Sequence, residues 1–422
     1  MTIAKTKVLW AGARIWFSPW RNRLVLPVLR SRLFAKTDIE RIDPTWSEVL
    51  FQRLMGRLLR SPLLFLGSLR KTLRVCATYR CNLSCEACYA RGLQEQFGTD
   101  MKLADFVRLV DWAKPKGWAK IRFLGGEPTM HPDFTGMLDT CYRNDMQVTL
   151  ATNNFFSEEV LDRLDNPLVY DIAVNYSSMH TADEKQRRLF RDNLRRMSER
   201  SMPFSLSHIV DSEGKDPLIP GLFEDIRRYR PTYLRVSLEL PAPSDPFTTE
   251  NLFRAREVLF RKIYGILKRC AKLYTPFYVY RPVPLCLFST KQRAMLKRFS
   301  SFVFFSRCPL SYAGDGGYGT MVTINPDMST FPCASVFLKG PEISSMGRRQ
   351  QRHDFYRQIL EPHLKKTLMD ECEKCKYHEA FLKILAGNKA LQPMLFHRPE
   401  SCQGGCINLR CHEFQKSGCA VE

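Results

Sequence analysis

The chain has 422 residues, 44% of them hydrophobic and 25% charged, a composition that excludes a mainly disordered protein. Its formal net charge is +21, and residues 1–75 hold fifteen Lys and Arg against four Asp and Glu, a net of +11. This excess indicates either an anionic partner or a solvated basic face, and charge alone does not decide between them.

The fifteen cysteines indicate metal sites in a reducing compartment. Disulfide scaffolds are usually short, and this chain shows no secretory signal, because Arg14 interrupts the apolar run at its start. No apolar stretch approaches the ~18 residues of a membrane span, and the longest candidate is Pro62–Leu69. We therefore expect a cytoplasmic protein whose cysteines are thiolate ligands.

Residues 1–71 are predicted to form a basic helical extension. Within Ser47–Arg60, leucines recur at helical spacing and arginines occupy other faces. The leucines are Leu50, Leu54 and Leu58, and the arginines are Arg53, Arg57 and Arg60. Such a helix either contacts an anionic membrane peripherally or packs its apolar stripe on the neighbouring domain, and the second case is the commoner.

Residues 72–245 alternate six short apolar runs with amphipathic stretches. The runs are 73–77, 120–124, 147–152, 170–176, 204–210 and 233–240, and the stretches between them include 103–113, 134–144 and 158–164. Six repeats of strand and helix predict an α/β fold with a parallel sheet, whose site lies at the C-terminal ends of the strands.

The rest of the chain is predicted to form two further regions. A Pro- and Ser-rich linker at 241–251 leads into a helical linker region, 246–304, with helices near 250–275 and 289–300. From 305 to 422 the chain is irregular and rich in cysteine. Segments of this kind are often held together by metal rather than by a large apolar core.

Three cysteines, Cys81, Cys85 and Cys88, directly follow the first predicted strand with the spacing C-x3-C-x2-C. Three thiolates on one loop can hold three irons of a cubane cluster and leave the fourth iron open, as a catalytic metal requires. A zinc finger would need a fourth ligand nearby, and a disulfide would leave one thiol over. The loop therefore favours an iron–sulfur cluster.

The second predicted strand ends in Phe-Leu-Gly125-Gly126-Glu127-Pro128. Two glycines allow the backbone to approach a ligand closely. Glu127 and nearby carbonyls can accept hydrogen bonds from an ammonium group. His131, in the loop that follows, is predicted to be structural.

The cysteine loop, followed by Tyr89, and the Gly-Gly-Glu-Pro segment together resemble the radical S-adenosylmethionine (radical SAM) superfamily. The resemblance implies a partial (β/α)6 barrel that binds a 4Fe–4S cluster through Cys81, Cys85 and Cys88. It also implies reductive cleavage of S-adenosylmethionine (AdoMet) to a 5′-deoxyadenosyl radical, which abstracts a hydrogen atom from the substrate. An electron donor such as flavodoxin or ferredoxin is implied as a partner.

The same resemblance implies the residues that contact AdoMet. The Gly-Gly-Glu-Pro segment holds its methionine amino group, and Tyr89 packs near its adenine. Further contacts come from Thr152 and Asn153 after the third strand and from Asn175 after the fourth. Many relatives have Ser-x-Asp-Gly at the fourth strand, and Ser177 replaces the Asp here.

Eight cysteines after residue 305 resemble the SPASM extension of radical SAM enzymes, which implies two auxiliary 4Fe–4S clusters. The first would use Cys308, Cys333 and Cys406, and the second Cys372, Cys375, Cys402 and either Cys411 or Cys419. Two departures are a 26-residue insertion, Lys376–Ser401, and Met328 in place of a glycine. A zinc site is the alternative for part of this region.

Four cysteines remain outside both groups. Cys76 on a strand and Cys141 on a helix are predicted to be buried. For Cys286, inert burial is favoured over a role as a cluster ligand or hydrogen-atom donor, and Cys270 is left unassigned.

Many SPASM enzymes modify ribosomally made peptides, which implies a peptide or protein substrate. One alternative keeps the chemistry and changes the substrate to a lipid or another membrane-associated small molecule. A second is a non-catalytic iron–sulfur or zinc protein that binds nucleic acid. No RNA-binding module is visible, and the intact Gly-Gly-Glu-Pro segment argues against an inactive enzyme.

Overall fold

The structure is a computed structural model, and it describes the barrel region most fully. The described residues are 72–85, 88, 90, 93–98, 100–211, 216–238, 256–273, 275, 277–279, 288–298, 303–306, 322–331, 339–345, 354–355, 358 and 396–397. The basic extension, with its Ser47–Arg60 segment, lies outside them. Among the described helices, none has the length and apolar character needed to cross a membrane.

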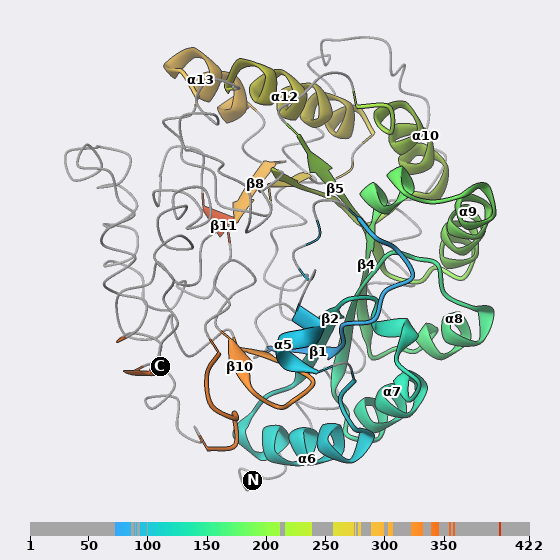
Figure 1. Cartoon of the computed structure of the whole chain (residues 1–422). Helices are drawn as coiled ribbons and strands as arrows, with labels where there is room; N and C mark the ends of the chain where they lie inside the picture. Colours follow the sequence, from blue (N-terminus) through green and yellow to red (C-terminus); the bar gives the residue numbers. More distant parts are fainter. Residues whose placement is uncertain are drawn as a thin grey trace, which may run out of the picture.

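Strands and helices alternate along the described chain (Figure 1). The strands are β1 (Thr72–Thr78), β2 (Lys120–Gly125), β3 (Gln147–Thr152), β4 (Val169–Asn175), β5 (Phe204–Val210), β6 (Leu234–Leu238), β7 (Phe277–Val279), β8 (Val303–Ser306), β9 (Val322–Ile324), β10 (Thr330–Phe331) and β11 (Phe396–His397). The α-helices are α5 (Leu93–Phe97), α6 (Leu103–Ala113), α7 (Phe134–Arg143), α8 (Glu158–Leu164), α9 (Glu184–Glu199), α10 (Ile219–Tyr229), α12 (Arg256–Lys272) and α13 (Thr290–Arg298). Short 3-10 helices are η3 (Lys114–Lys116), η4 (Pro128–Met130) and η5 (Tyr176–His180).

The strands form a single curved sheet in the order β10-β9-β1-β2-β3-β4-β5-β6-β7-β8-β11. Neighbours from β1 to β8 are parallel, and no pairing between described residues joins the two ends of the sheet. The six predicted strands are confirmed as β1 to β6, and the fold is a partial barrel. The sheet continues into β7 and β8, within the region where we expected only helices.

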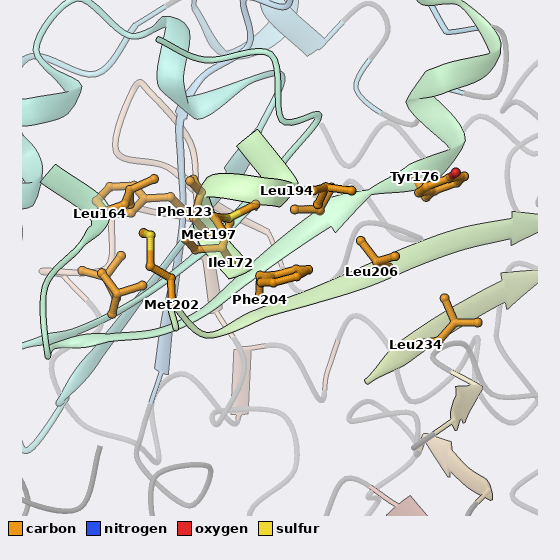
Figure 2. Close-up of a cluster of buried hydrophobic side chains, with 14 of the residues drawn as sticks. Phe123, Leu164, Ile172, Tyr176, Leu194, Met197, Met202, Phe204, Leu206 and Leu234 are labelled. Carbon is orange, nitrogen blue, oxygen red and sulfur yellow. The ribbon is translucent and has the colours of Figure 1, made fainter. Parts of the chain in front are cut away.

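Helices cover the outer side of this sheet (Figure 1). Side chains alternate along each strand, so that every second residue faces the helices. Phe123, Ile172 and Phe204 on the strands belong to one buried cluster with Leu194 and Met197 of α9 (Figure 2). All five are fully buried, and each such side chain contributes about 1.5–3 kcal/mol by leaving water.

Local sequence determines where the covering helices begin. Asp183 and Gln186 form a capping box at the start of α9, with each side chain bonding the other residue's backbone N–H. The Ser157 hydroxyl accepts from the Val160 N–H at the start of α8. These caps end the loops after β3 and β4 at defined residues, and those loops carry candidate site residues.

Candidate functional site

The three cysteines lie in an irregular segment immediately after β1. Cys81 is exposed, Cys85 and Cys88 are partly buried, and none of the three forms a disulfide. The pKa of Cys81 is raised, chiefly because its surroundings partly desolvate the sulfur although the residue as a whole is exposed, and also because negative charge on Glu127, Cys88 and Cys85 disfavours the thiolate. Cys85 and Cys88 therefore lie close enough to Cys81 for their negative charges to repel its thiolate. A positively charged metal group would relieve that repulsion.

Three thiolate sulfurs on one loop are a donor set that fits a 4Fe–4S cluster. Among the described residues, no three His, Cys, Asp or Glu side chains converge as one ion requires. A cubane cluster is bound by each cysteine through a different iron, so its protein sulfurs need not meet at one point. Three cysteines would leave the fourth iron for another ligand.

Gly125, the last residue of β2, and Gly126, which follows it, bring the end of that strand against the residues that precede Cys81. Gly126 N donates to Thr78 O at 2.9 Å, and Glu127 N donates to Arg80 O at 2.7 Å. A Cβ on Gly126 would lie 2.2 Å from Arg80 O, and Gly125 has a φ of +130°. Only glycine permits this approach. The Gly-Gly pair therefore fixes the β2 loop to the residues that enter the cysteine loop.

Glu127 is buried and connects the ends of two strands. Its Oε1 accepts from Thr129 N (3.2 Å), Thr129 Oγ1 (2.7 Å) and Thr152 Oγ1 (2.9 Å), and its Oε2 accepts from Asn153 N (2.7 Å). Burial raises the pKa of Glu127, and these hydrogen bonds lower it only in part. The carboxylate thus orders the loops after β2 and β3, and its contact with AdoMet stays a prediction.

Asn153 directs its side chain toward the cysteine loop. Its Nδ2 donates to Asn82 Oδ1 at 2.5 Å and lies 3.8 Å from Cys81 Sγ. Its Oδ1 accepts from Phe155 N at 3.1 Å. The neighbouring Thr152 hydroxyl accepts from Asn154 N while it donates to Glu127. The pair predicted from the sequence therefore joins the cysteine loop to the β2 loop.

The loops after β4 and β5 meet through a chain of polar side chains that the sequence did not indicate. Ser177 Oγ accepts from Ile209 N at 2.8 Å and lies 3.2 Å from His208 Nδ1. His208 Nε2 lies 2.6 Å from Asp216 Oδ2. Asp216 Oδ2 accepts from His208 Nε2–H, and His208 Nδ1 lies within hydrogen-bond distance of the Ser177 hydroxyl.

The carboxylate of Asp216 is the charged end of this series of hydrogen-bonded side chains. Burial raises the pKa of Asp216, but the hydrogen bond and charge of His208, with smaller effects from Leu218 N–H and His180, hold it below its usual value. His208 has no exposed surface. In the sequence, the contacts between Ser177, His208 and Asp216 were indicated only by the polar residues at the C-terminal ends of β4 and β5.

The remaining predicted residues have different outcomes. Pro128 begins η4 and is buried, and Asn175 ends β4, where its backbone O accepts from Ser178 Oγ at 2.6 Å. His131 is buried, with Nε2 2.8 Å from Met101 O and Nδ1 accepting from Asp133 N, which supports a structural role.

The cysteines outside the loop divide between buried thiols and residues that the structure does not describe. Cys76 and Cys141 are buried as predicted, and burial raises the pKa of Cys76 to about 12. Cys270, which the sequence left unassigned, is also buried. Tyr89 and Cys286 lie outside the described residues. So do the eight C-terminal cysteines: Cys308, Cys333, Cys372, Cys375, Cys402, Cys406, Cys411 and Cys419.

Known proteins resemble this chain in sequence and in fold. The GTP 3′,8-cyclase of Mannheimia succiniciproducens is 31% identical over 111 residues, which is 25% of this chain and 33% of that protein. The chain thus spans about a third of the length of this curated relative.

Solved structures extend the likeness to most of the chain. Hexahistidine-tagged anSMEcpe with bound AdoMet matches 82% of this chain and 94% of that one, with 14% identity and a TM-score of 0.53. Native anSMEcpe with bound AdoMet and Kp18Cys peptide matches 80% and 89%, with 14% identity and a TM-score of 0.51. At this identity the likeness concerns the fold alone.

The family comparison covers the site itself. Residues 75–201 match the Radical SAM superfamily. The matched segment holds the cysteine loop, the Gly-Gly-Glu-Pro turn and the ends of β3 and β4. Residues 75–201 of this chain are therefore a radical SAM domain.

Proposed function

We propose that this protein is a radical SAM enzyme that cleaves AdoMet reductively and abstracts a hydrogen atom from a peptide or protein. The observation that carries the proposal is the hydrogen-bonded assembly of three loops. Gly126 N and Glu127 N bond the residues before Cys81, and the Glu127 carboxylate bonds the end of β3. Such an assembly holds the three-cysteine loop beside the Gly125-Gly126 turn, whose backbone a ligand can approach closely.

The residues of the assembly have separable tasks. Cys81, Cys85 and Cys88 would hold three irons of a 4Fe–4S cluster. When bound, the cluster and AdoMet supply an electron and a sulfonium whose cleavage yields the hydrogen-abstracting radical. Gly125 and Gly126 would let AdoMet approach the backbone, and Asn175 would bind its carboxylate or ribose. Thr152 and Asn153 would keep this edge rigid.

The C-terminal region, 305–422, would hold two auxiliary 4Fe–4S clusters. Support comes from the number and spacing of the eight cysteines, which resemble the SPASM pattern. We propose the domain boundaries at 71/72, 245/246 and 304/305, where the composition and the hydrophobic pattern of the sequence change. An oxygen-sensitive cluster protein of this kind belongs in the reducing cytoplasm and needs an electron donor such as flavodoxin or ferredoxin.

A peptide substrate is supported by the SPASM-like cysteine pattern and agrees with the Kp18Cys peptide bound by the fold neighbour anSMEcpe. The relative from Mannheimia succiniciproducens is a GTP cyclase, so a small-molecule substrate is the alternative.

A lipid substrate is favoured only by the basic Ser47–Arg60 segment. It would require co-sedimentation with anionic vesicles that weakens with salt and on changing Arg53, Arg57 and Arg60 to Glu.

The test is anaerobic incubation of the reconstituted protein with AdoMet, dithionite and candidate peptides. We expect 5′-deoxyadenosine and methionine, and a modified peptide by mass spectrometry. If 5′-deoxyadenosine forms but no peptide changes, the substrate class is wrong and the chemistry stands. If no 5′-deoxyadenosine forms from protein with a full cluster, the proposed chemistry is wrong.

A further inference from the structure

Two polar side chains outside the cysteine loop lie against two of its sulfurs. Asn153 Nδ2 is 3.8 Å from Cys81 Sγ, and Thr181 Oγ1 is 3.7 Å from Cys85 Sγ. Hydrogen bonds to sulfur are longer than those to oxygen. The contacts span 72 and 96 residues of sequence, so the fold and not local chain geometry brings these groups together.

The orientation of the Asn153 amide is fixed by its other partners. Its Oδ1 accepts from Phe155 N, so the NH₂ group must point the opposite way, toward Asn82 and Cys81. One amide hydrogen serves Asn82 Oδ1, and the second is left for the sulfur. Asn153 is 7% exposed, so water competes little for that hydrogen.

Thr181 is the weaker of the two donors. Its side chain is exposed, and its single hydroxyl hydrogen also lies within reach of Ser178 O, at 3.3 Å. Water and that carbonyl therefore compete with Cys85 for it. Burial and a fixed orientation distinguish Asn153 from Thr181, and their effects should differ accordingly.

We propose that Asn153, with Thr181 as a weaker second donor, hydrogen-bonds the cluster thiolates and raises the reduction potential of the cluster. The inference rests on the proposed function, because it assumes that Cys81 and Cys85 hold the cluster. Reduction adds a negative charge, and hydrogen-bond donors to the ligand sulfurs stabilise the more negative state. Asn153 is then a positioning residue for the cluster. This role differs from the AdoMet contact that the sequence predicted.

The test is a redox titration of the reconstituted protein followed by electron paramagnetic resonance, without AdoMet, so that AdoMet binding cannot affect the result. Eight C-terminal Cys→Ala changes would leave the signal of the Cys81 loop alone. Asn153→Ala and Asn153→Asp should shift the midpoint to a more negative potential. Thr181→Val should shift it the same way by less, and Thr181→Ser should restore the wild-type value.

Ser178→Ala is the matched control, because the Ser178 hydroxyl donates to Asn153 O and Asn175 O and not to sulfur. Its midpoint should equal the wild-type value. Iron content and the visible spectrum check that each variant keeps its cluster. If the C-terminal changes prevent folding, the same titration is run on the full-length parent, where the AdoMet-dependent change of its signal identifies this cluster.

The outcomes separate this inference from the proposed function. If Asn153→Ala keeps its iron and its midpoint equals that of the wild type, the inference is wrong, while the cluster and its chemistry stand. If Asn153→Ala loses its cluster, the midpoint potentials of Thr181→Val and Thr181→Ser are compared instead. Equal midpoint potentials of these two variants overturn the proposal. If the wild type assembles no cluster on the Cys81 loop, the proposed function fails and this inference fails with it.

Discussion

Replacing Glu127 by Gln tests whether this side chain holds the site loops together. A carboxylate accepts all four hydrogen bonds at Glu127, whereas an amide has one oxygen. If the Gln oxygen replaces Oε1, its NH₂ group faces Asn153 N–H, which then has no acceptor. A buried N–H left without a partner destabilises by about 1–3 kcal/mol, and the three other bonds weaken because their acceptor is neutral.

One effect opposes this loss. Burial raises the pKa of Glu127, so the charged form is itself disfavoured in the fold, and a neutral Gln avoids that cost. We therefore expect a net loss of about 1–3 kcal/mol, visible as a lower urea midpoint by circular dichroism of the metal-free protein. Glu158→Gln, on the exposed start of α8, is the matched control and should stay near the wild type. A wild-type midpoint for Glu127→Gln would refute the reasoning.

Three further predictions concern other parts of the site. Gly126→Ala should lower the urea midpoint and the iron content, because its Cβ would lie 2.2 Å from Arg80 O. Gly265→Ala in α12 is the control, and it should stabilise the protein by about 0.5–1 kcal/mol because the space around its Cβ is open. An equal response of the two variants would contradict the account. Asp216→Asn should destabilise the protein at pH 7, since a carboxyl whose pKa is lowered in the fold stabilises the fold above its unfolded pKa of about 3.9. The difference in urea midpoint between variant and wild type should shrink as the pH falls below that value. A pH-independent difference would exclude this role of the Asp216 carboxylate. Anaerobic reconstitution should give about twelve irons per chain, from three clusters of four, and four irons with zinc in the C-terminal region would remove the auxiliary clusters and keep the core.

The strands and the motif loops could be predicted because their signals are local. Each of β1 to β6 is rich in apolar residues over five to seven positions, and β3, β5, α6 and α8 begin and end at the predicted residues. The three cysteines and the Gly-Gly pair are short contiguous patterns that bear directly on their chemistry. Burial of Cys76 and Cys141 followed in the same way from their apolar surroundings.

The rest depends on contacts between distant segments. The strands β7 and β8 have three and four residues, too few for a periodicity to appear. Ser177, His208 and Asp216 come from three segments, and no local pattern indicates that they meet. Asn153 also contacts a distant segment, since its partner Asn82 is 71 residues away. A sequence pattern indicated that Asn153 mattered, but only the fold indicates what it touches.

The most direct test of the central claim is the rate of 5′-deoxyadenosine formation in the triple variant Cys81→Ala, Cys85→Ala, Cys88→Ala. Protein, AdoMet and dithionite are incubated anaerobically, and the product is quantified by chromatography and mass spectrometry. Cys270→Ala, which changes a buried thiol in α12, is the control and should behave as the wild type. The account predicts that the triple variant forms no 5′-deoxyadenosine while keeping its C-terminal iron. Formation at the wild-type rate would contradict it.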